Sequence, residues 1–335
     1  MSQQDSIDEA VARLDRGEVV ALPTETVYGL AALATSDAAV DAIFELKGRP
    51  RAHPLIIHLA DADWLHEWTL APSALALRLA EAFWPGPLTL VLSPSPRVSD
   101  RVTGGQPTVA VRVPAHPLAR EVLRRLGRPL AAPSANRFGK LSPTRAQHVR
   151  DEFGNAVFVL DGGACSVGVE STIVDVISEG SPRILRPGGV TREQLEACAG
   201  ISFLEGGGAV RVPGALASHY APRATVEIVS TAELSNRVDA AAAAGLRVGV
   251  LSFGDAAASD AAASHATATS RAAVRGALAE VRLPSDLTEA ARELYAALRS
   301  LDAQGLDRIF VCLPADEGVG RAIVDRLRRA AGPRD

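Results

Sequence analysis

Short apolar runs alternate with segments of helical periodicity along nearly the whole chain, and this alternation constrains the fold more than any other feature. The runs Val19–Leu22 and Leu55–Leu59 have the length of buried strands, and Pro or polar residues bound them. The spacing of Ile7, Val11 and Leu14 instead favours one face of a helix. A chain that repeats both patterns is predicted to be an α/β protein.

The same signals continue through the first two hundred residues. Further strands are predicted at 88–92, 109–113, 130–132, 157–160, 172–176 and 183–185. Helices are predicted at 37–46, 73–83, 116–126 and 144–153, and a capping box at residues 191–194 opens one more. Because several of these strands follow one another with no helix between them, the sheet should be mixed.

The composition changes after residue 203 and changes again near residue 225. Gly and Pro cluster within residues 204–224, which is typical of a linker, although His219 and Tyr220 stand side by side in it. The segment is either a passive spacer or a lid that packs over something. From residue 225 strands and helices alternate regularly, interrupted by an Ala/Ser-rich stretch, which predicts a small parallel sheet. We expect three parts: a catalytic domain (1–203), a linker (204–224) and a small α/β domain (225–335).

Composition excludes several classes of protein. The net charge of −4 argues against a protein whose main task is to coat nucleic acid. Cys165, Cys198 and Cys312 are too far apart for a disulfide framework or a metal knuckle. The start of the chain lacks an apolar stretch of signal-peptide length, and no later stretch would span a membrane. We therefore expect a soluble, cytoplasmic protein with no metal-ligand cluster.

Polar and basic residues concentrate in loops at strand ends, where sheet proteins bind ligands. These loops are residues 23–30, 47–54, 106–114 and 132–144. The second contains Lys47, Arg49, Arg51 and His53 among Gly and Pro residues, a concentration of positive charge that an anion such as polyphosphate would neutralise. The chain contains only two lysines, which favours a specific task for Lys47.

The remaining loops supply hydroxyls, an arginine and the start of a helix. Arg112 shares one face of its strand with Ala110, and is either paired inside the protein or directed into a cleft. Ser142 and Thr144 lie at the start of a predicted helix whose first N–H groups could bind a phosphate. A nucleophile with its base is not recognisable in the sequence. The pattern therefore favours attack of an already anionic nucleophile on phosphorus in a nucleotide triphosphate, where the protein orients and neutralises.

Several short motifs occur between residues 5 and 200. They are PTETVYGL, Lys47-Gly48-Arg49, Trp84-Pro85-Gly86-Pro87, Val111-Arg112-Val113-Pro114, Ser134-Ala135-Asn136, Glu170-Ser171-Thr172 and Leu185-Arg186-Pro187-Gly188. Together and in this order, these motifs resemble the YrdC-type domain of the threonylcarbamoyl-AMP synthases. The Ser-His-Tyr-Ala-Pro linker and the small domain resemble the two-domain form of the enzyme. The implied fold is a twisted mixed YrdC-like sheet with helices around a basic concave site, followed by a smaller Rossmann-like parallel domain.

The resemblance implies the reaction. ATP, L-threonine and bicarbonate would give threonylcarbamoyl-AMP and pyrophosphate, with Mg²⁺ accompanying ATP. A separate tRNA threonylcarbamoyl transferase complex would then modify adenosine 37 of tRNA, so this chain needs neither a membrane nor stable nucleic-acid binding.

The resemblance also implies the site residues. L-threonine would be held by Thr26, His58, Arg112, Ala132 and Ser171. ATP would be held by Arg49, His53, Thr108, Ser134, Ser142 and Arg186. The catalytic signature would be Lys47, Arg49, Ser134 and Asn136, with Lys47 near the phosphates and the carbamate.

Two positions depart from the family pattern. Ala217 stands where a nucleotide-contacting Tyr is expected, and His53 stands where Asn is frequent. Three other readings remain: an RNA-binding YrdC-like module without this chemistry, carbamoyl transfer in hydrogenase maturation, and a regulatory relative with a broken site. The acidic net charge and the shortage of aromatic residues weigh against the RNA-binding module. Carbamoyl transfer in hydrogenase maturation normally involves zinc-finger and acylphosphatase segments, which this sequence lacks. The complete catalytic signature argues against a regulatory relative with a broken site.

Overall fold

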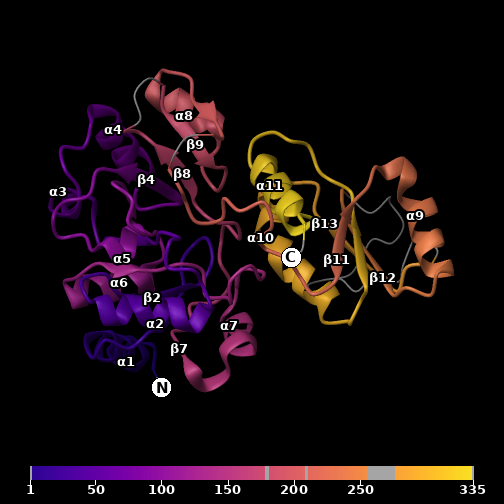
Figure 1. Ribbon diagram of the computed structural model, residues 1–335, viewed down its shortest axis with the longest axis horizontal. Coiled ribbons are helices and arrows are strands. Elements are labelled where there is room, and N and C mark those ends of the chain that lie inside the picture. Colours follow the sequence, from indigo (N-terminus) through magenta and orange to yellow (C-terminus); the bar gives the residue numbers. More distant parts are fainter. Residues whose placement is uncertain (1, 178–180, 208–209, 255–275, 334–335) are drawn as a thin grey trace. The chain divides into compact units, whose positions relative to one another are not determined.

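A computed structural model of the chain describes residues 2–177, 181–207, 210–254 and 276–333. It divides into two compact units (Figure 1). The first consists of Met1–Phe138 and Ser142–Ala215, and the second of Gly139–Leu141 and Leu216–Asp335. Residues 255–275 of the Ala/Ser-rich stretch and residues 208–209 of the linker lie outside the described residues.

The first unit is built on a ten-stranded sheet with the order β10-β9-β8-β4-β5-β3-β6-β2-β1-β7. Its strands are β1 (Val20–Leu22), β2 (Gly29–Leu33), β3 (Ile56–His58), β4 (Leu88–Leu92), β5 (Val109–Arg112), β6 (Leu130–Ala131), β7 (Phe158–Val159), β8 (Thr172–Asp175), β9 (Arg183–Arg186) and β10 (Leu204–Glu205). Neighbours such as β3 and β5 are parallel, whereas β4 and β5 are antiparallel. The predicted mixed sheet is confirmed.

Helices line this sheet, and polar caps fix where several of them begin. They are α1 (Gln3–Asp15), α2 (Asp37–Lys47), α3 (Leu65–Trp68), α4 (Ala74–Phe83), α5 (Asp100–Thr103), α6 (Pro117–Leu126), α7 (Ala146–Phe153) and α8 (Arg192–Ala199), with 3₁₀ turns η1 (Ala62–Trp64) and η2 (Gly154–Ala156). The predicted capping box at Thr191 and Gln194 is present at the start of α8. Gly48 ends α2 in the left-handed conformation, with φ of 63°, and so turns the chain into the basic loop.

The two faces of the central strands differ in what covers them. Alternate residues such as Ile57 and Val111 belong to the large core that also contains side chains of α1, α2, α4 and α6. The residues between them, such as Ile56 and Ala110, belong to a small cluster on the other face. Because strand side chains alternate, His58 and Arg112 lie on the face of Ile56 and Ala110. This face, here called the polar face, carries the candidate site.

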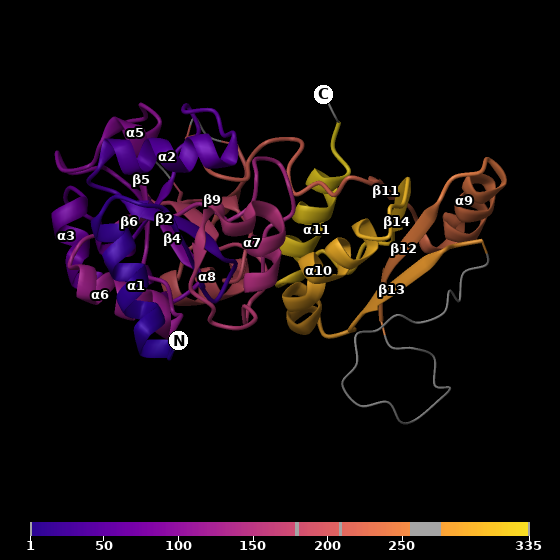
Figure 2. The same cartoon turned by 90° about the horizontal axis from the view of Figure 1, so that it is seen from below.

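The second unit has a four-stranded parallel sheet of order β11-β14-β12-β13. Its strands are β11 (Thr225–Ile228), β12 (Val248–Phe253), β13 (Ala279–Leu283) and β14 (Arg308–Val311), and its helices are α9 (Thr231–Ala243), α10 (Leu287–Asp302) and α11 (Gly320–Ala330). In both views α10 and α11 lie on one side of this sheet and α9 on the other (Figures 1 and 2). The prediction of a small parallel α/β unit is confirmed.

Three local expectations need correction. Gly29 and Leu30 are not loop residues, because they begin strand β2, which pairs with β1. The helix expected from Thr144 begins at Ala146, so Ser142 lies four residues before it. The amide of Thr144 is also taken, because it donates to Nδ1 of His148 at 3.2 Å.

No helix in the described ranges is long and apolar enough to cross a membrane.

Candidate active site

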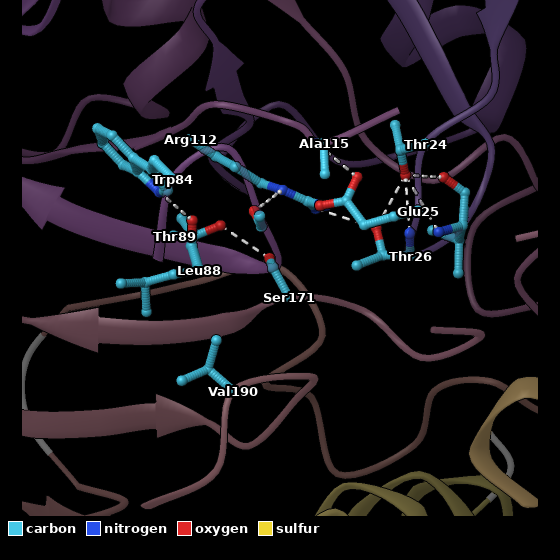
Figure 3. Close-up of polar contacts among 12 residues, drawn as sticks. Thr24, Glu25, Thr26, Trp84, Leu88, Thr89, Arg112, Ala115, Ser171 and Val190 are labelled. Carbon is cyan, nitrogen blue, oxygen red and sulfur yellow. Dashed lines mark hydrogen bonds and ion pairs between the residues drawn. The ribbon is translucent and has the colours of Figure 1, made fainter. Parts of the chain in front are cut away.

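A buried ion pair lies at the centre of the polar face. Arg112, the last residue of β5, donates through Nη2 to Oε1 of Glu25 at 2.6 Å. Its Nη1 donates to the hydroxyl of Thr26 at 3.0 Å, and its Nε donates to the carbonyl of Gly86 at 3.1 Å. Figure 3 shows these side chains pointing toward one another. Of the two placements left open for Arg112, the structure shows an arginine that is paired inside the protein.

His58 lies beside Arg112, since the two residues are register partners on the parallel strands β3 and β5. Its ring is buried, and Nδ1 is 3.3 Å from the carbonyl oxygen of Ile56. Burial and the neighbouring Arg112 charge lower the pKa of His58 to about 3. The imidazole is therefore neutral at physiological pH, and it can bind a substrate without adding another buried charge.

Ser171 is held between Thr89 and Arg186. Its hydroxyl shares a hydrogen bond of 2.7 Å with the hydroxyl of Thr89, a residue of β4 on the polar face. Arg186 donates through Nε and Nη2 to the Ser171 carbonyl at 3.1 and 2.9 Å. Strict alternation would place Arg186 on the same face as Ile184, but the register between β8 and β9 shifts at this point. Sequence patterns did not reveal this irregularity.

The basic loop after α2 is partly buried. Arg49 is buried, donates through Nη2 to the carbonyl of Pro54 at 3.0 Å, and lies 5.6 Å from the ring centre of Phe138. The His53 ring meets the same Phe138 ring edge-on at 5.3 Å. Burial and Arg49 lower the pKa of His53. Arg51 is exposed and pairs with Asp41 instead. The loop is thus a partly buried group built around an aromatic ring, not an exposed positive cluster.

Lys47 is directed into the protein. Its Nζ donates to the backbone carbonyls of Ser134 and Asn136, both at 2.5 Å, and the side chain is buried. Burial and Arg49 hold the pKa of Lys47 well below its ordinary value. The motifs Lys47-Gly48-Arg49 and Ser134-Ala135-Asn136 are therefore brought together, but the described contacts of this ammonium are backbone carbonyls.

The remaining predicted residues also lie in the first unit. Ser142 donates to Oε1 of Glu170 at 2.5 Å, and both side chains are buried. Thr108 is buried just before β5, and the Ala132 amide donates to the carbonyl of Ile56 at 3.1 Å. The carboxylates of Glu25 and Glu170 were not assigned a role from the sequence, although both stand inside the motifs that were singled out.

Residues 210–213, here called the strap, pack on the polar face. Val212 is buried in the cluster formed by Ile56, Val91, Ala110 and Ile173. The backbone of Arg211 exchanges two hydrogen bonds with the amide side chain of Gln106, at 3.0 and 2.7 Å. Arg186 Nη1 donates to the carbonyl of Pro213 at 2.9 Å. The strap thus contacts the loop of Thr108 and a second predicted ATP residue, Arg186.

His219 and Tyr220 belong to the second unit. Tyr220 is buried with φ of 58°, and Arg326 lies 5.1 Å from its ring centre. The amide of His219 donates to the carbonyl of Arg329 at 3.1 Å. This part of the linker is therefore packed into a core and is not a loose spacer.

Comparison with known proteins identifies the family. One family model, described as telomere recombination (Sua5/YciO/YrdC), matches residues 12–188, and a model of the threonylcarbamoyl-AMP synthase C-terminal domain matches residues 190–332. The threonylcarbamoyl-AMP synthase of Bacillus subtilis is 42% identical over 98% of this chain and 93% of its own length. The chain belongs to the threonylcarbamoyl-AMP synthase family.

Two further members show how much of the chain the likeness covers. The crystal structure of Pyrococcus abyssi Sua5 complexed with L-threonine matches with a TM-score of 0.86 and 38% identity, over 97% of this chain and 94% of that one. The shorter threonylcarbamoyl-AMP synthase of Chromohalobacter salexigens is 41% identical over 52% of this chain and 94% of its own length. The predicted fold and family are confirmed.

Proposed function

We propose that this enzyme forms threonylcarbamoyl-AMP and pyrophosphate from ATP, L-threonine and bicarbonate. The observation that carries the proposal is the polar face of the first unit, where the Arg112 ion pair, neutral His58 and the Ser171–Arg186 group lie on adjoining strands. The C. salexigens synthase matches only about half of this chain, which supports a reaction that needs only one of the two units.

In this proposal the ion-pair region holds threonine. Arg112 meets the substrate carboxylate, because a guanidinium matches that group in shape and charge. Thr26, His58, Ser171 and the backbone at Ala132 complete the threonine site. The P. abyssi protein, whose structure contains L-threonine, supports this ligand.

We propose that ATP is bound by the remaining predicted residues. They are Arg49, His53, Thr108, Ser134, Ser142 and Arg186. The guanidinium groups of Arg49 and Arg186 counter the phosphate charges. Lys47 acts through its two carbonyl contacts, which fix the segment from Ser134 to Asn136.

The chemical step needs orientation more than a strong base. Threonine and bicarbonate condense to a carbamate with loss of water, and the carbamate oxygen then attacks the α-phosphorus of ATP. A new P–O bond forms, the bond to the β-phosphate oxygen breaks, and pyrophosphate leaves with the electron pair. Because the nucleophile is already an anion, the cationic side chains position it and neutralise the charge that accumulates at phosphorus.

Magnesium fits this scheme as part of the nucleotide. Within the described ranges there is no group of three or more His, Cys, Asp or Glu that could hold a metal ion. Glu25 and Glu170 are engaged by Arg112 and Ser142. Mg²⁺ commonly binds through substrate phosphates and water, so we propose that it enters with ATP.

The product is a mixed anhydride, which reacts readily with an amine. We propose that a tRNA threonylcarbamoyl transferase complex consumes it for modification of adenosine 37, and that the enzyme works in the cytoplasm with its tRNA-modifying partners. The chain itself needs no stable contact with RNA in this scheme.

Pyrophosphate release measured with each substrate omitted in turn tests the proposal. We expect release only when ATP, L-threonine and bicarbonate are all present. ATP turnover that is indifferent to threonine and bicarbonate would contradict it. Tight, steeply salt-dependent RNA binding without any pyrophosphate release would favour the RNA-binding module instead.

A further inference from the structure

Glu25 is a buried carboxylate to which the proposed reaction gives no task. It lies between β1 and β2, and 7% of its side chain is exposed. Figure 3 shows it between Arg112 and the backbone of Ala115, on the side of Arg112 that also carries Thr26. A buried charge at a proposed substrate site needs an explanation, because burial alone disfavours it.

Both carboxylate oxygens of Glu25 have a defined partner. Oε1 accepts from Arg112 Nη2 at 2.6 Å, and Oε2 accepts from the amide of Ala115 at 2.9 Å. Burial opposes ionisation, but Arg112 and the Ala115 amide hold the pKa of Glu25 below its ordinary value. Glu25 is therefore an anion with a fixed orientation.

The orientation of Glu25 sets that of Arg112. A guanidinium has five N–H groups in one plane, and three of those in Arg112 donate to Gly86, Thr26 and Glu25. Among the described residues, this leaves one N–H on each terminal nitrogen. A substrate carboxylate can accept from such guanidinium N–H groups through short, charge-assisted hydrogen bonds.

We propose that Glu25 is a positioning residue that fixes the plane of Arg112 so that its remaining terminal N–H groups meet the carboxylate of the amino-acid substrate. The proposal rests on the proposed function, which places threonine at Arg112. Glu25 itself does not touch the substrate. Its effect should therefore appear in the recognition of the substrate carboxylate and not in the binding of ATP.

The Glu25→Gln variant tests this role. Glutamine replaces one of the two carboxylate oxygens by an N–H₂ group, and this group must then face one of the two donors, Arg112 or Ala115. We expect the KM for L-threonine in pyrophosphate release to rise about tenfold or more, the range for losing a hydrogen bond to a charged group. The KM for ATP should stay within about threefold of the wild-type value, a much smaller change.

L-threonine amide separates positioning from a general structural effect. This analogue lacks the carboxylate, so its inhibition constant against L-threonine should be nearly equal in the wild type and in Glu25→Gln. Glu67→Gln is a matched control, because it removes an exposed carboxylate paired only loosely with Arg97, at 3.5 Å. It should leave both constants unchanged.

The possible outcomes are distinct. An unchanged KM for L-threonine in Glu25→Gln, or an equal loss of affinity for L-threonine and its amide, would overturn the positioning role. If Glu25→Gln does not fold, Glu25→Asp tests the role instead. Aspartate keeps the charge but is too short to accept from both Arg112 and Ala115. A wild-type KM for L-threonine in Glu25→Asp would also overturn the role. If the wild type itself shows no threonine-dependent release, the proposed function fails, and not this inference alone.

Discussion

The contact between Gln106 and the strap offers a clean test of how the polar face is covered. Gln106 is half-buried and Arg211 is exposed, so the Gln106→Ala substitution should leave the core of the first unit intact. It removes both hydrogen bonds between the Gln106 amide and the Arg211 backbone. The contacts of Val212 and Pro213 remain. We expect the strap to leave the polar face more often while the unit stays folded.

The size of the effect follows from the two lost hydrogen bonds. Each is worth about 0.5–1.5 kcal/mol net, so the pair contributes about 1–3 kcal/mol. This corresponds to a roughly 5- to 150-fold larger open population, since about 1.4 kcal/mol equals a factor of ten.

Limited trypsin digestion measures this population. The Arg211–Val212 bond can be cut only when buried Val212 leaves its cluster. Under conditions in which reclosing is faster than cleavage, the cutting rate follows the open population. The rate at this bond, quantified by mass spectrometry, should therefore rise by the same factor in Gln106→Ala.

Gln106→Glu is the matched control for this experiment. It keeps an acceptor for the Arg211 amide but loses the donor to the Arg211 carbonyl, so its rate should lie between those of the wild type and Gln106→Ala. An unchanged rate at Arg211 in Gln106→Ala would refute the reasoning. So would an equal rise at other tryptic sites, since that would indicate general unfolding.

Two further predictions concern buried groups of the site. Lys47→Met removes the Nζ that donates to the Ser134 and Asn136 carbonyls. Turnover in the pyrophosphate assay should fall by about 10²-fold, the cost of a small misplacement at a reacting centre. Near-normal turnover would contradict the role proposed for Lys47. His58 has a pKa of about 3 in the folded state against 6.5 in an unfolded chain, so folding excludes its proton and stability is lost as pH falls below 6.5. Between pH 7 and 5 urea denaturation should show the wild type losing about 2 kcal/mol more than His58→Asn. Equal losses in the two proteins would contradict a neutral buried His58.

Local patterns predicted most of the fold. Strand β4 begins and ends at the residues expected, and helix α2 begins where expected and ends one residue later, because an apolar run and an amphipathic helix carry strong local signals. Strand β2 was missed because Gly29–Leu33 consists of Gly, Ala and Leu, which favour a strand only weakly. Its place in the sheet comes from pairing with β1 and β6, which a local pattern does not contain.

The site could be predicted in its residue types but not in its contacts. Charged and hydroxyl residues at strand ends indicated a candidate site, and Thr26, His58, Arg112 and Ser171 lie on adjoining elements. The partners were not predictable, because Glu25 meets Arg112 across 87 residues of sequence and Lys47 meets Ser134 across the same separation. Such pairings depend on the register of a mixed sheet. The turn of Arg186 toward Ser171 depends in addition on an irregularity between β8 and β9.

Isotope labelling of the product tests the central claim most directly. The enzyme is incubated with ATP, L-threonine and ¹³C-bicarbonate, and the nucleotide product is analysed by mass spectrometry. If the carbamate carbon comes from bicarbonate, the threonylcarbamoyl-AMP peak shifts by the mass of one neutron relative to the unlabelled reaction. An unshifted peak, or threonine joined directly to AMP through its own carboxylate, would contradict the proposed reaction.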